Sequence, residues 1–121
     1  MIVGIGTDMI EIERVVKACE KEAFLLRAFS MEEQRLIKSN ITKAADNFAV
    51  KEAVAKVFGT GFRGIKLNEI EVLRDPLGKP YVNLYGAAKE LAKQLQLRQL
   101  HVSITNTREF ASAFVVGESE E

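Results

Sequence analysis

The segment that most constrains how this chain folds is the apolar stretch 48–61, FAVKEAVAKVFGTG. Residues 48–58 contain no Gly or Pro, and their Ala, Val, Lys and Glu content predicts a helix from Phe48 to Phe58. Gly59-Thr60-Gly61 then ends this helix, because glycine is the usual residue just past a helix end. Most of its circumference is apolar, which is typical of a helix buried in the core.

Three charged residues interrupt that apolar surface: Lys51, Glu52 and Lys56. At the spacing of an α-helix they fall within one arc of roughly 140°, and a charge on a buried helix needs a partner. In a purely structural interpretation, Glu52 and Lys56 form an i,i+4 ion pair and Lys51 lies at the rim. In a functional one, the carboxylate holds a metal, the lysines meet an anion, and the Gly-Thr-Gly backbone approaches the ligand. The helix alone leaves both open.

Length and composition narrow the class of protein. A chain of 121 residues is expected to form one domain, residues 1–121. Lys and Arg number 17, as do Asp and Glu, and this zero net charge argues against a nucleic-acid binder. Cys19 is the only cysteine, which excludes an intramolecular disulfide and a cysteine-based zinc site. Without a basic leader or a long apolar run, we expect a cytoplasmic protein with no membrane partner.

The first third of the chain predicts one strand and two helices before the apolar one. Residues 1–8 form the strand, in which Gly4 and Gly6 allow close approach by another backbone. Apolar residues at helical spacing predict a helix over 11–27. Ser30 and Glu33 form a capping box that opens a short helix ending near Ser39, and Thr42 is a plausible N-cap of the apolar helix.

The rest of the chain predicts strands joined by short turns. The expected elements are a hairpin of strands 67–74 and 81–84, a helix over 86–97, strands 100–105 and 110–116, and a frayed acidic C-terminal end. Short turns imply antiparallel pairing. The predicted class is α+β, with helices packed on one face of a small, mainly antiparallel sheet.

Several polar residues have both a structural and a functional interpretation. Asp8, at the end of the first strand, is either a helix N-cap or a ligand. His101 lies on the polar face of an alternating strand, where a lone histidine is more often structural than catalytic. Lys79 fits an ordinary turn lysine. Arg14, Lys17 and Lys21 share a helix face, for which a solvated surface is the simpler interpretation and an acidic partner the sharper one.

Four motifs, taken together, resemble one family. They are GIGTD at 4–8, FAVKEAVAKVFGTG at 48–61, GKPYV at 78–82 and HVSITNT at 101–107. In this order and spacing they resemble the holo-[acyl-carrier-protein] synthases, the short 4′-phosphopantetheinyl transferases, over nearly the whole chain. The resemblance implies Mg²⁺-dependent transfer of the 4′-phosphopantetheine arm of coenzyme A to a serine of apo acyl carrier protein, which releases adenosine 3′,5′-bisphosphate.

The resemblance also implies roles for residues. Asp8 and Glu52 match the family's metal carboxylates, and Lys56 matches a lysine near the pyrophosphate; these three are the expected catalytic residues. The positions that match residues lining or supporting the coenzyme A cleft are Lys51, Gly59, Thr60, Gly61, Lys79, Pro80, His101, Ser103 and Thr105. For the proton of the serine nucleophile, a metal-bound water, Glu52 and His101 all stay open as acceptors.

Partners follow from the same resemblance. Family members are typically homotrimers with clefts between subunits, so one cleft would use residues from two chains. They meet the acidic carrier protein through basic residues, here Arg14, Lys17 and Lys21, with Arg27 beyond them. Such contacts mainly speed association. The enzyme would belong to fatty acid and lipid biosynthesis.

The chain departs from the family pattern at two positions. Asn47 stands where the family commonly has Arg, so a phosphate contact is either missing or supplied by Lys43 or Lys38, and Asn106 stands where His is common. Two other classes of function remain as alternatives. One is a non-enzymatic module that binds coenzyme A or acidic proteins, and the other is a structural oligomer whose charges are all ion pairs.

Overall fold

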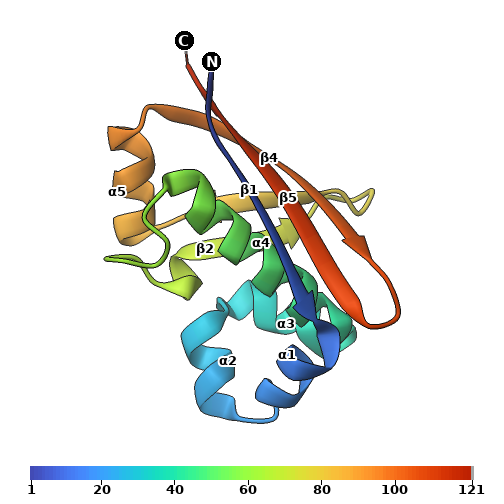
Figure 1. Ribbon diagram of the computed structural model, residues 1–121. Helices are drawn as coiled ribbons and strands as arrows, with labels where there is room; N and C mark the ends of the chain where they lie inside the picture. The colour runs from blue at the N-terminus through green and yellow to red at the C-terminus, as the bar shows by residue number, and fades with distance from the viewer. Residues whose placement is uncertain (121) are drawn as a thin grey trace.

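Helix α4, Thr42–Phe58, runs through the centre of the molecule between two β-sheets (Figure 1). The structure is a computed structural model that describes residues 1–120. The helix is longer at its start than the predicted 48–58, and it ends as predicted, with Gly59 in the left-handed conformation at φ 81°. Twelve of its residues are buried, from Ala44 to Phe58, as the apolar sequence indicates.

The elements alternate between helical and extended blocks along the chain. In order they are β1 (Ile2–Glu11), α1 (Ile12–Ala18), α2 (Glu22–Ala28), α3 (Met31–Ser39), α4, the 3-10 turn η1 (Leu67–Glu69), β2 (Ile70–Arg74), β3 (Pro80–Leu84), α5 (Gly86–Gln94), β4 (Leu97–Asn106) and β5 (Phe110–Ser119).

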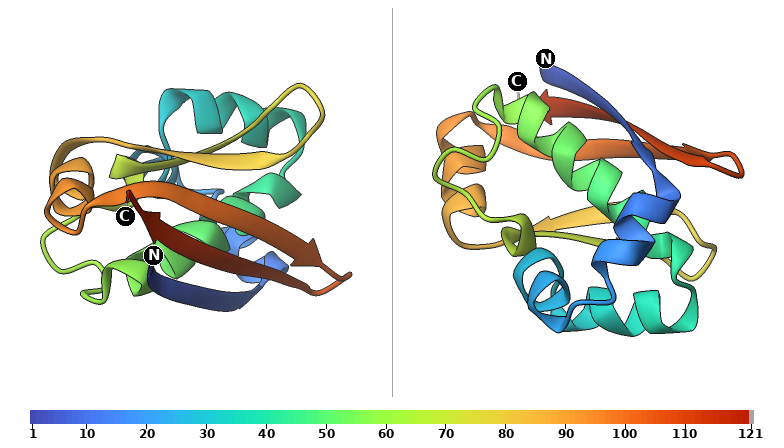
Figure 2. Two further views of the ribbon diagram at one scale, coloured as in Figure 1. Left: turned by 90° about the horizontal axis from the view of Figure 1, so that it is seen from above. Right: turned by 60° about the horizontal axis from the view of Figure 1, so that its bottom comes forward.

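The strands form a three-stranded sheet of order β1-β5-β4 and a two-stranded sheet of β2 and β3. All the pairings are antiparallel, which confirms the α+β class and the predicted hairpin. The predicted single small sheet is in fact split into two, and α4 packs against both (Figure 2). Within the described residues, none of the helices combines the length and apolar character that a membrane span needs.

The close packing of α4 on β1 depends on glycine. A Cβ atom on Gly4 would lie 2.7 Å from the carbonyl oxygen of Val57, and one on Gly6 would overlap the carbonyl oxygen of Ala53. The expected approach of another backbone is therefore confirmed, and that backbone is α4. Since side chains alternate along a strand, Asp8 lies on the same side of β1 as the two glycines and faces α4.

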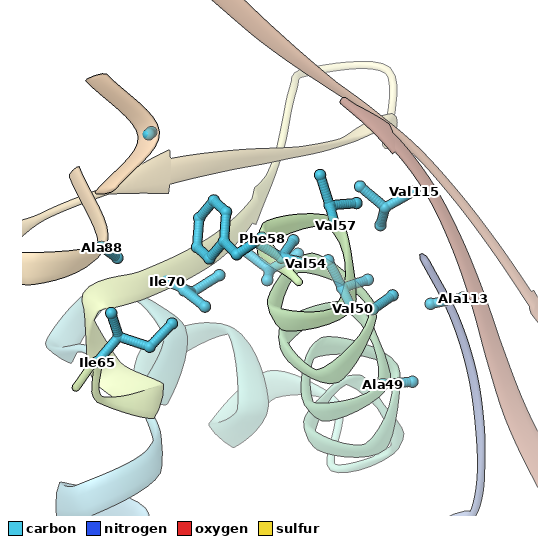
Figure 3. Close-up of a cluster of buried hydrophobic side chains, with 13 residues drawn as sticks. Ala49, Val50, Val54, Val57, Phe58, Ile65, Ile70, Ala88, Ala113 and Val115 are labelled. Carbon is cyan, nitrogen blue, oxygen red and sulfur yellow. The ribbon is translucent and has the colours of Figure 1, made fainter. Parts of the chain in front are cut away.

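Two hydrophobic clusters surround α4. The larger joins the helix to both sheets and to α5 through Val50, Val54 and Phe58 (Figure 3). The smaller lies under α1, α2 and α3 and contains Phe29 and Cys19. Strands or other helices pack against α4 on most of its sides. Its sequence is therefore apolar nearly all round.

The predicted helix 11–27 is wrong in two respects. Strand β1 continues through Glu11, and Glu11 is the residue before α1, so Asp8 does not cap a helix. The helical stretch also breaks after Ala18, where Lys21 adopts an extended backbone before α2. The break lets α2 turn onto the smaller cluster. Because the segment contains no Gly or Pro, its sequence does not indicate this break.

Smaller differences concern where elements begin and end. Thr42 is the first residue of α4 and not its cap; the Asn40 side chain accepts hydrogen bonds from the Thr42 backbone and hydroxyl. Residues 67–69 form η1 instead of the start of a strand, and α5 ends at Gln94. The C-terminal end was predicted to be frayed, but it is ordered in β5 up to Ser119. The backbone N–H of Ser119 donates to the Met1 carbonyl at 2.8 Å. The Ser30–Glu33 capping box is confirmed.

Candidate active site

Asp8 and Glu52 come together where β1 crosses α4. Lys56, one helical turn after Glu52, places its Nζ 3.6 Å from Oδ1 of Asp8 and 2.7 Å from the backbone carbonyl of Thr7. Lys56 is thus paired across to the strand, whereas the structural interpretation had placed it with Glu52. Two residues far apart in sequence and one cation meet at a single point of the surface.

The two carboxylates influence each other electrostatically. Burial raises the pKa of Asp8, and the nearby positive charge of Lys56 partly opposes that rise. Burial also raises the pKa of Glu52, and the negative charge of Asp8 raises it further, while Lys56 lowers it. Both acids are therefore less easily ionised than free side chains. Additional positive charge placed between them would relieve both the burial and the repulsion.

Both carboxylates line a surface pocket of about 350 Å³. Its other lining residues are Met9, Ile10, Glu11, Arg14, Phe48 and Phe110. Among residues 1–120, no three His, Cys, Asp or Glu side chains group as metal ligands. Mg²⁺ is commonly bound through one or two carboxylates, substrate phosphates and water. Two carboxylates that repel each other beside an open pocket match this mode of Mg²⁺ binding. They do not match a closed site in which the protein supplies all the metal ligands.

The Gly59-Thr60-Gly61 segment continues from the C-terminal end of α4. Gly59 and Gly61 have φ values of 81° and 61°, and no atom lies within 4 Å of a Cβ built on either glycine. The backbone of this loop is therefore open to solvent and can be approached by a ligand. Glu52, Lys56 and Thr60 follow one another at intervals of four residues, so they extend along one side of the helix and its end.

Lys51 lies elsewhere, and the expected position at the rim is wrong. Its side chain is 0% exposed and pairs with Glu33 at 2.8 Å. The same Nζ donates to the carbonyl of Leu67 at 2.9 Å and to that of Ile70. An ammonium group has three hydrogens to donate, and these contacts use them all. Lys51 is therefore buried inside the chain, where it can support a coenzyme A cleft but does not line an open one.

A second group of predicted residues gathers at β3 and β4. Lys79, Pro80 and His101 line one pocket of about 270 Å³. His101 lies opposite Val116, and its Nε2 is 3.0 Å from Oε1 of Glu118. Ser103 and Thr105 follow it on the same exposed side of β4.

Asp8 and His101 lie on opposite faces of the three-stranded sheet. Asp8 and Val115 both face α4. Because side chains alternate along a strand, Val116 faces away from α4, and so does His101, its partner on β4. One chain thus brings together the carboxylates with Lys56, and separately Lys79 with Pro80 and His101. It does not bring the two groups into one pocket.

The four expected partner-binding residues share a third pocket, although the helix that was to carry them is broken. Arg14, Lys17, Lys21 and Arg27 all line it. Arg14 also lines the carboxylate pocket, so the basic surface leads directly to Asp8 and Glu52.

Sequence reasoning missed Phe24, which lies among these cations. The guanidinium of Arg27 lies 5.8 Å from the ring centroid of Phe24, and the Phe24 and Phe48 centroids are 6.0 Å apart. Phe48 in turn lines the carboxylate pocket. An aromatic residue at helical spacing resembles a core residue, and only the bend between α1 and α2 places it here.

The two departures from the expected pattern have structural roles. Asn47 is buried and its Nδ2 donates to Glu33 at 3.1 Å and to the Val72 carbonyl at 2.9 Å. Asn106 donates to Oδ1 of Asp46 at 2.7 Å. Lys38, one of two lysines expected to replace a missing arginine, lines a separate groove with Cys19 and Met31. It does not line either pocket that holds the predicted catalytic or cleft residues.

Comparison with known proteins agrees with these features. Residues 4–115 match the model of the 4′-phosphopantetheinyl transferase superfamily. A holo-[acyl-carrier-protein] synthase of Lachnoclostridium phytofermentans is 67% identical over 118 residues, covering 98% of this chain and 97% of the relative.

Solved structures are also similar. The holo-[acyl-carrier-protein] synthase of Neisseria meningitidis matches with a TM-score of 0.89 at 31% identity, covering 98% of this chain and 100% of that one. The Helicobacter pylori synthase, solved in complex with coenzyme A, matches with a TM-score of 0.84 at 31% identity, covering 94% and 99%.

Proposed function

The chain belongs to the 4′-phosphopantetheinyl transferase superfamily and is an enzyme of the holo-[acyl-carrier-protein] synthase type, and from this we propose its reaction in detail. The 4′-phosphopantetheine arm of coenzyme A passes to a serine hydroxyl of apo acyl carrier protein. A bond forms between the serine oxygen and the phosphorus of the arm, and the serine hydroxyl gives its proton to Glu52, to His101 or to a metal-bound water. The bridging phosphorus–oxygen bond breaks, and adenosine 3′,5′-bisphosphate leaves with the electron pair.

One observation carries this proposal: Asp8, Glu52 and Lys56 meet beside a pocket that shares Arg14 with the basic surface. Asp8 and Glu52 would hold Mg²⁺. When bound, this ion supplies positive charge that offsets the negative charge growing on the bridging oxygen. Lys56 places a second positive charge next to the leaving phosphate, and its side chain is 55% exposed, so a phosphate can reach it.

The remaining residues orient the two substrates. The open backbone of Gly59-Thr60-Gly61 can approach phosphate oxygens without a side-chain clash. Lys79, Pro80 and His101, with Ser103 and Thr105 beyond, are proposed to bind the nucleotide half of coenzyme A. The basic surface of Arg14, Lys17, Lys21 and Arg27 binds the acidic carrier protein and delivers its serine to the carboxylates.

We further propose that the enzyme is a homotrimer with its clefts between subunits. Asp8 and His101 lie on opposite faces of one sheet, so a cleft that uses both residues needs a second copy of the chain. The face turned away from α4 also carries uncovered apolar side chains: Ile5 is 59% exposed, Met9 67% and Phe114 46%. The strand register places Ile5 beside Val116 and Thr7 beside Phe114, so these side chains form one patch. A contiguous apolar patch is typical of a protein interface.

Wider roles follow from the proposed reaction. Residues 1–121 would act as one domain, the location would be the cytoplasm, and the product would serve fatty acid and lipid biosynthesis. The match of the superfamily model over residues 4–115 supports the single domain.

The direct test is to incubate the protein with coenzyme A, Mg²⁺ and apo acyl carrier protein and to weigh the carrier protein by mass spectrometry. We expect a gain of ~340 Da, the mass of the transferred arm, and none when EDTA replaces Mg²⁺. The Glu52→Gln variant should give no product, whereas Glu90→Gln, which changes an exposed acid on α5, should behave as wild type. An unmodified carrier protein with the wild-type enzyme would overturn the proposal.

A further inference from the structure

The side chains of His101 and Glu118 are hydrogen-bonded to each other on the sheet face turned away from α4. The register of β4 and β5 places His101 opposite Val116 and Gln99 opposite Glu118. His101 and Glu118 are therefore diagonal neighbours, close enough for their side chains to meet, and the Nε2–Oε1 distance is 3.0 Å. The side chains are 49% and 44% exposed, so a ligand can still reach the pair.

The carboxylate of Glu118 has basic groups near it. Its pKa is lowered chiefly by the hydrogen bond from His101, and the charges of the amino terminus and of Arg98 lower it further. Glu118 is thus ionised at neutral pH, and a carboxylate can only accept hydrogen bonds. The hydrogen between the two side chains is therefore carried by Nε2 of His101.

A hydrogen held on Nε2 leaves Nδ1 as the ring nitrogen that meets a ligand. Within residues 1–120, the hydrogen-bond partner of the His101 side chain is Glu118. The ring lines the same pocket as Lys79, Pro80 and Tyr81. An imidazole already fixed through one nitrogen loses less conformational freedom when it binds a ligand through the other.

We propose that Glu118 is a positioning residue for coenzyme A, acting through His101 and not touching the substrate itself. It fixes both the orientation and the tautomer of the imidazole, so that Nδ1 is presented to the nucleotide half of coenzyme A. This inference rests on the proposed function. Because Asp8 and Glu52 lie on the other face of the sheet, Glu118 should affect the binding of coenzyme A and leave phosphoryl transfer itself almost unchanged.

The first experiment measures steady-state kinetics of Glu118→Gln, which keeps the size of the side chain but removes its charge. We expect KM for coenzyme A to rise about 3- to 20-fold, the effect of replacing a charge-assisted hydrogen bond with a weaker neutral one, and kcat to change by less than about twofold. The matched control is Glu120→Gln, which removes an exposed acid two residues away and should leave both constants unchanged. Thermal unfolding of each variant verifies that the fold is intact.

The second experiment asks whether Glu118 acts through His101. His101→Ala and the double variant His101→Ala/Glu118→Gln are compared in the same assay. If the carboxylate acts by holding the imidazole, removing it should have no further effect once the imidazole is gone. The KM values of His101→Ala and of the double variant should then agree within about twofold.

Several outcomes overturn the inference. Glu118→Gln with an unchanged KM contradicts it, as does a fall in kcat equal to the rise in KM, or a Glu118→Gln effect that persists fully without His101. If any of these occurs while the wild-type enzyme modifies the carrier protein normally, only the role of Glu118 is overturned. A wild-type enzyme that transfers no arm overturns both this inference and the proposed function.

Discussion

At the scale of single residues, two partly buried carboxylates, Asp8 and Glu52, lower the folding stability of the protein when they are ionised. Burial raises the pKa of both Asp8 and Glu52, and their mutual repulsion adds to the shift of Glu52. A carboxyl group whose pKa is higher in the folded than in the unfolded state binds more protons when folded. Folding stability must then fall as the pH rises through that interval. This arrangement is typical of functional sites.

We therefore predict that Glu52→Gln is slightly more stable than the wild type at pH 7, by less than about 1 kcal/mol. The difference should disappear as the pH falls below 4.5, the ordinary pKa of glutamate, where the wild-type side chain is protonated in both states. Denaturant unfolding at a series of pH values measures it. Mg²⁺ should raise the stability of the wild type more than that of Glu52→Gln. Equal stabilisation of both would exclude Glu52 from the metal site.

At the scale of elements, a buried polar network joins α3, α4 and β2. Glu33 accepts from Lys51 at 2.8 Å, from Asn47 at 3.1 Å and from the Val72 backbone at 3.1 Å. Burial lowers the pKa of Lys51 and raises that of Glu33, and the charge of each opposes the shift of the other. A buried ion pair is costly to break from one side, because the remaining charge is left without a partner.

We predict that Lys51→Met destabilises the protein by about 3–5 kcal/mol. KM for coenzyme A should be unchanged in the folded fraction, because Lys51 does not reach a ligand. Urea unfolding and kinetics at low temperature measure the two effects. The control is Glu33→Gln/Lys51→Met, which removes both charges and should cost less than the sum of the single changes. A selective rise in KM for Lys51→Met would return this lysine to the binding residues.

The bend between α1 and α2 places basic side chains from both helices around Phe24. We predict that Lys17→Glu raises KM for the carrier protein about tenfold at low salt and leaves KM for coenzyme A unchanged. The rise should shrink at high ionic strength, where exposed charges are screened.

The matched control for the basic surface is Lys38→Glu. It introduces the same change of charge on α3, in a groove that does not include the basic surface. It should leave KM for the carrier protein near the wild-type value. Equal effects of the two substitutions would mean that net charge, and not this surface, attracts the carrier protein.

At the scale of the whole molecule, the placement of the two residue groups on opposite sheet faces predicts complementation between subunits. Glu52→Gln and His101→Ala should each be impaired, since each removes one part of every cleft. Mixed homotrimers would contain some clefts with both residues intact. We therefore expect the mixture, after dissociation and reassembly, to be more active than the sum of the separate variants.

The control mixture combines Glu52→Gln with Asp8→Asn, two changes that fall in the same group on one chain. Because both residues come from the same subunit, no mixed cleft would recover a complete carboxylate pair, and activity should stay at the level of the separate variants. If the first mixture shows no recovery although light scattering finds trimers, each cleft is built within one chain.

The sequence by itself determined the class of fold and the central helix. An apolar helix ended by glycine, two glycines in the first strand and strict alternation over residues 100–105 are local patterns, and local sterics and side-chain periodicity are enough to interpret them. The motifs also identified the family, because their types and spacing are specific. They predicted Asp8, Glu52 and Lys56 as the catalytic residues, and the structure brings these three side chains together. The Ser30–Glu33 capping box was predictable for the same local reason.

Only the tertiary structure decided what depends on contacts between distant segments. It buried Lys51 against Glu33, broke the first helix so that α2 packs on the smaller hydrophobic cluster, and moved Phe24 into the basic surface. It also set His101 and Asp8 on opposite faces of one sheet, through a strand register that no single segment contains. Burial and charge pairing are properties of neighbours in space, and a sequence pattern reports only neighbours along the chain.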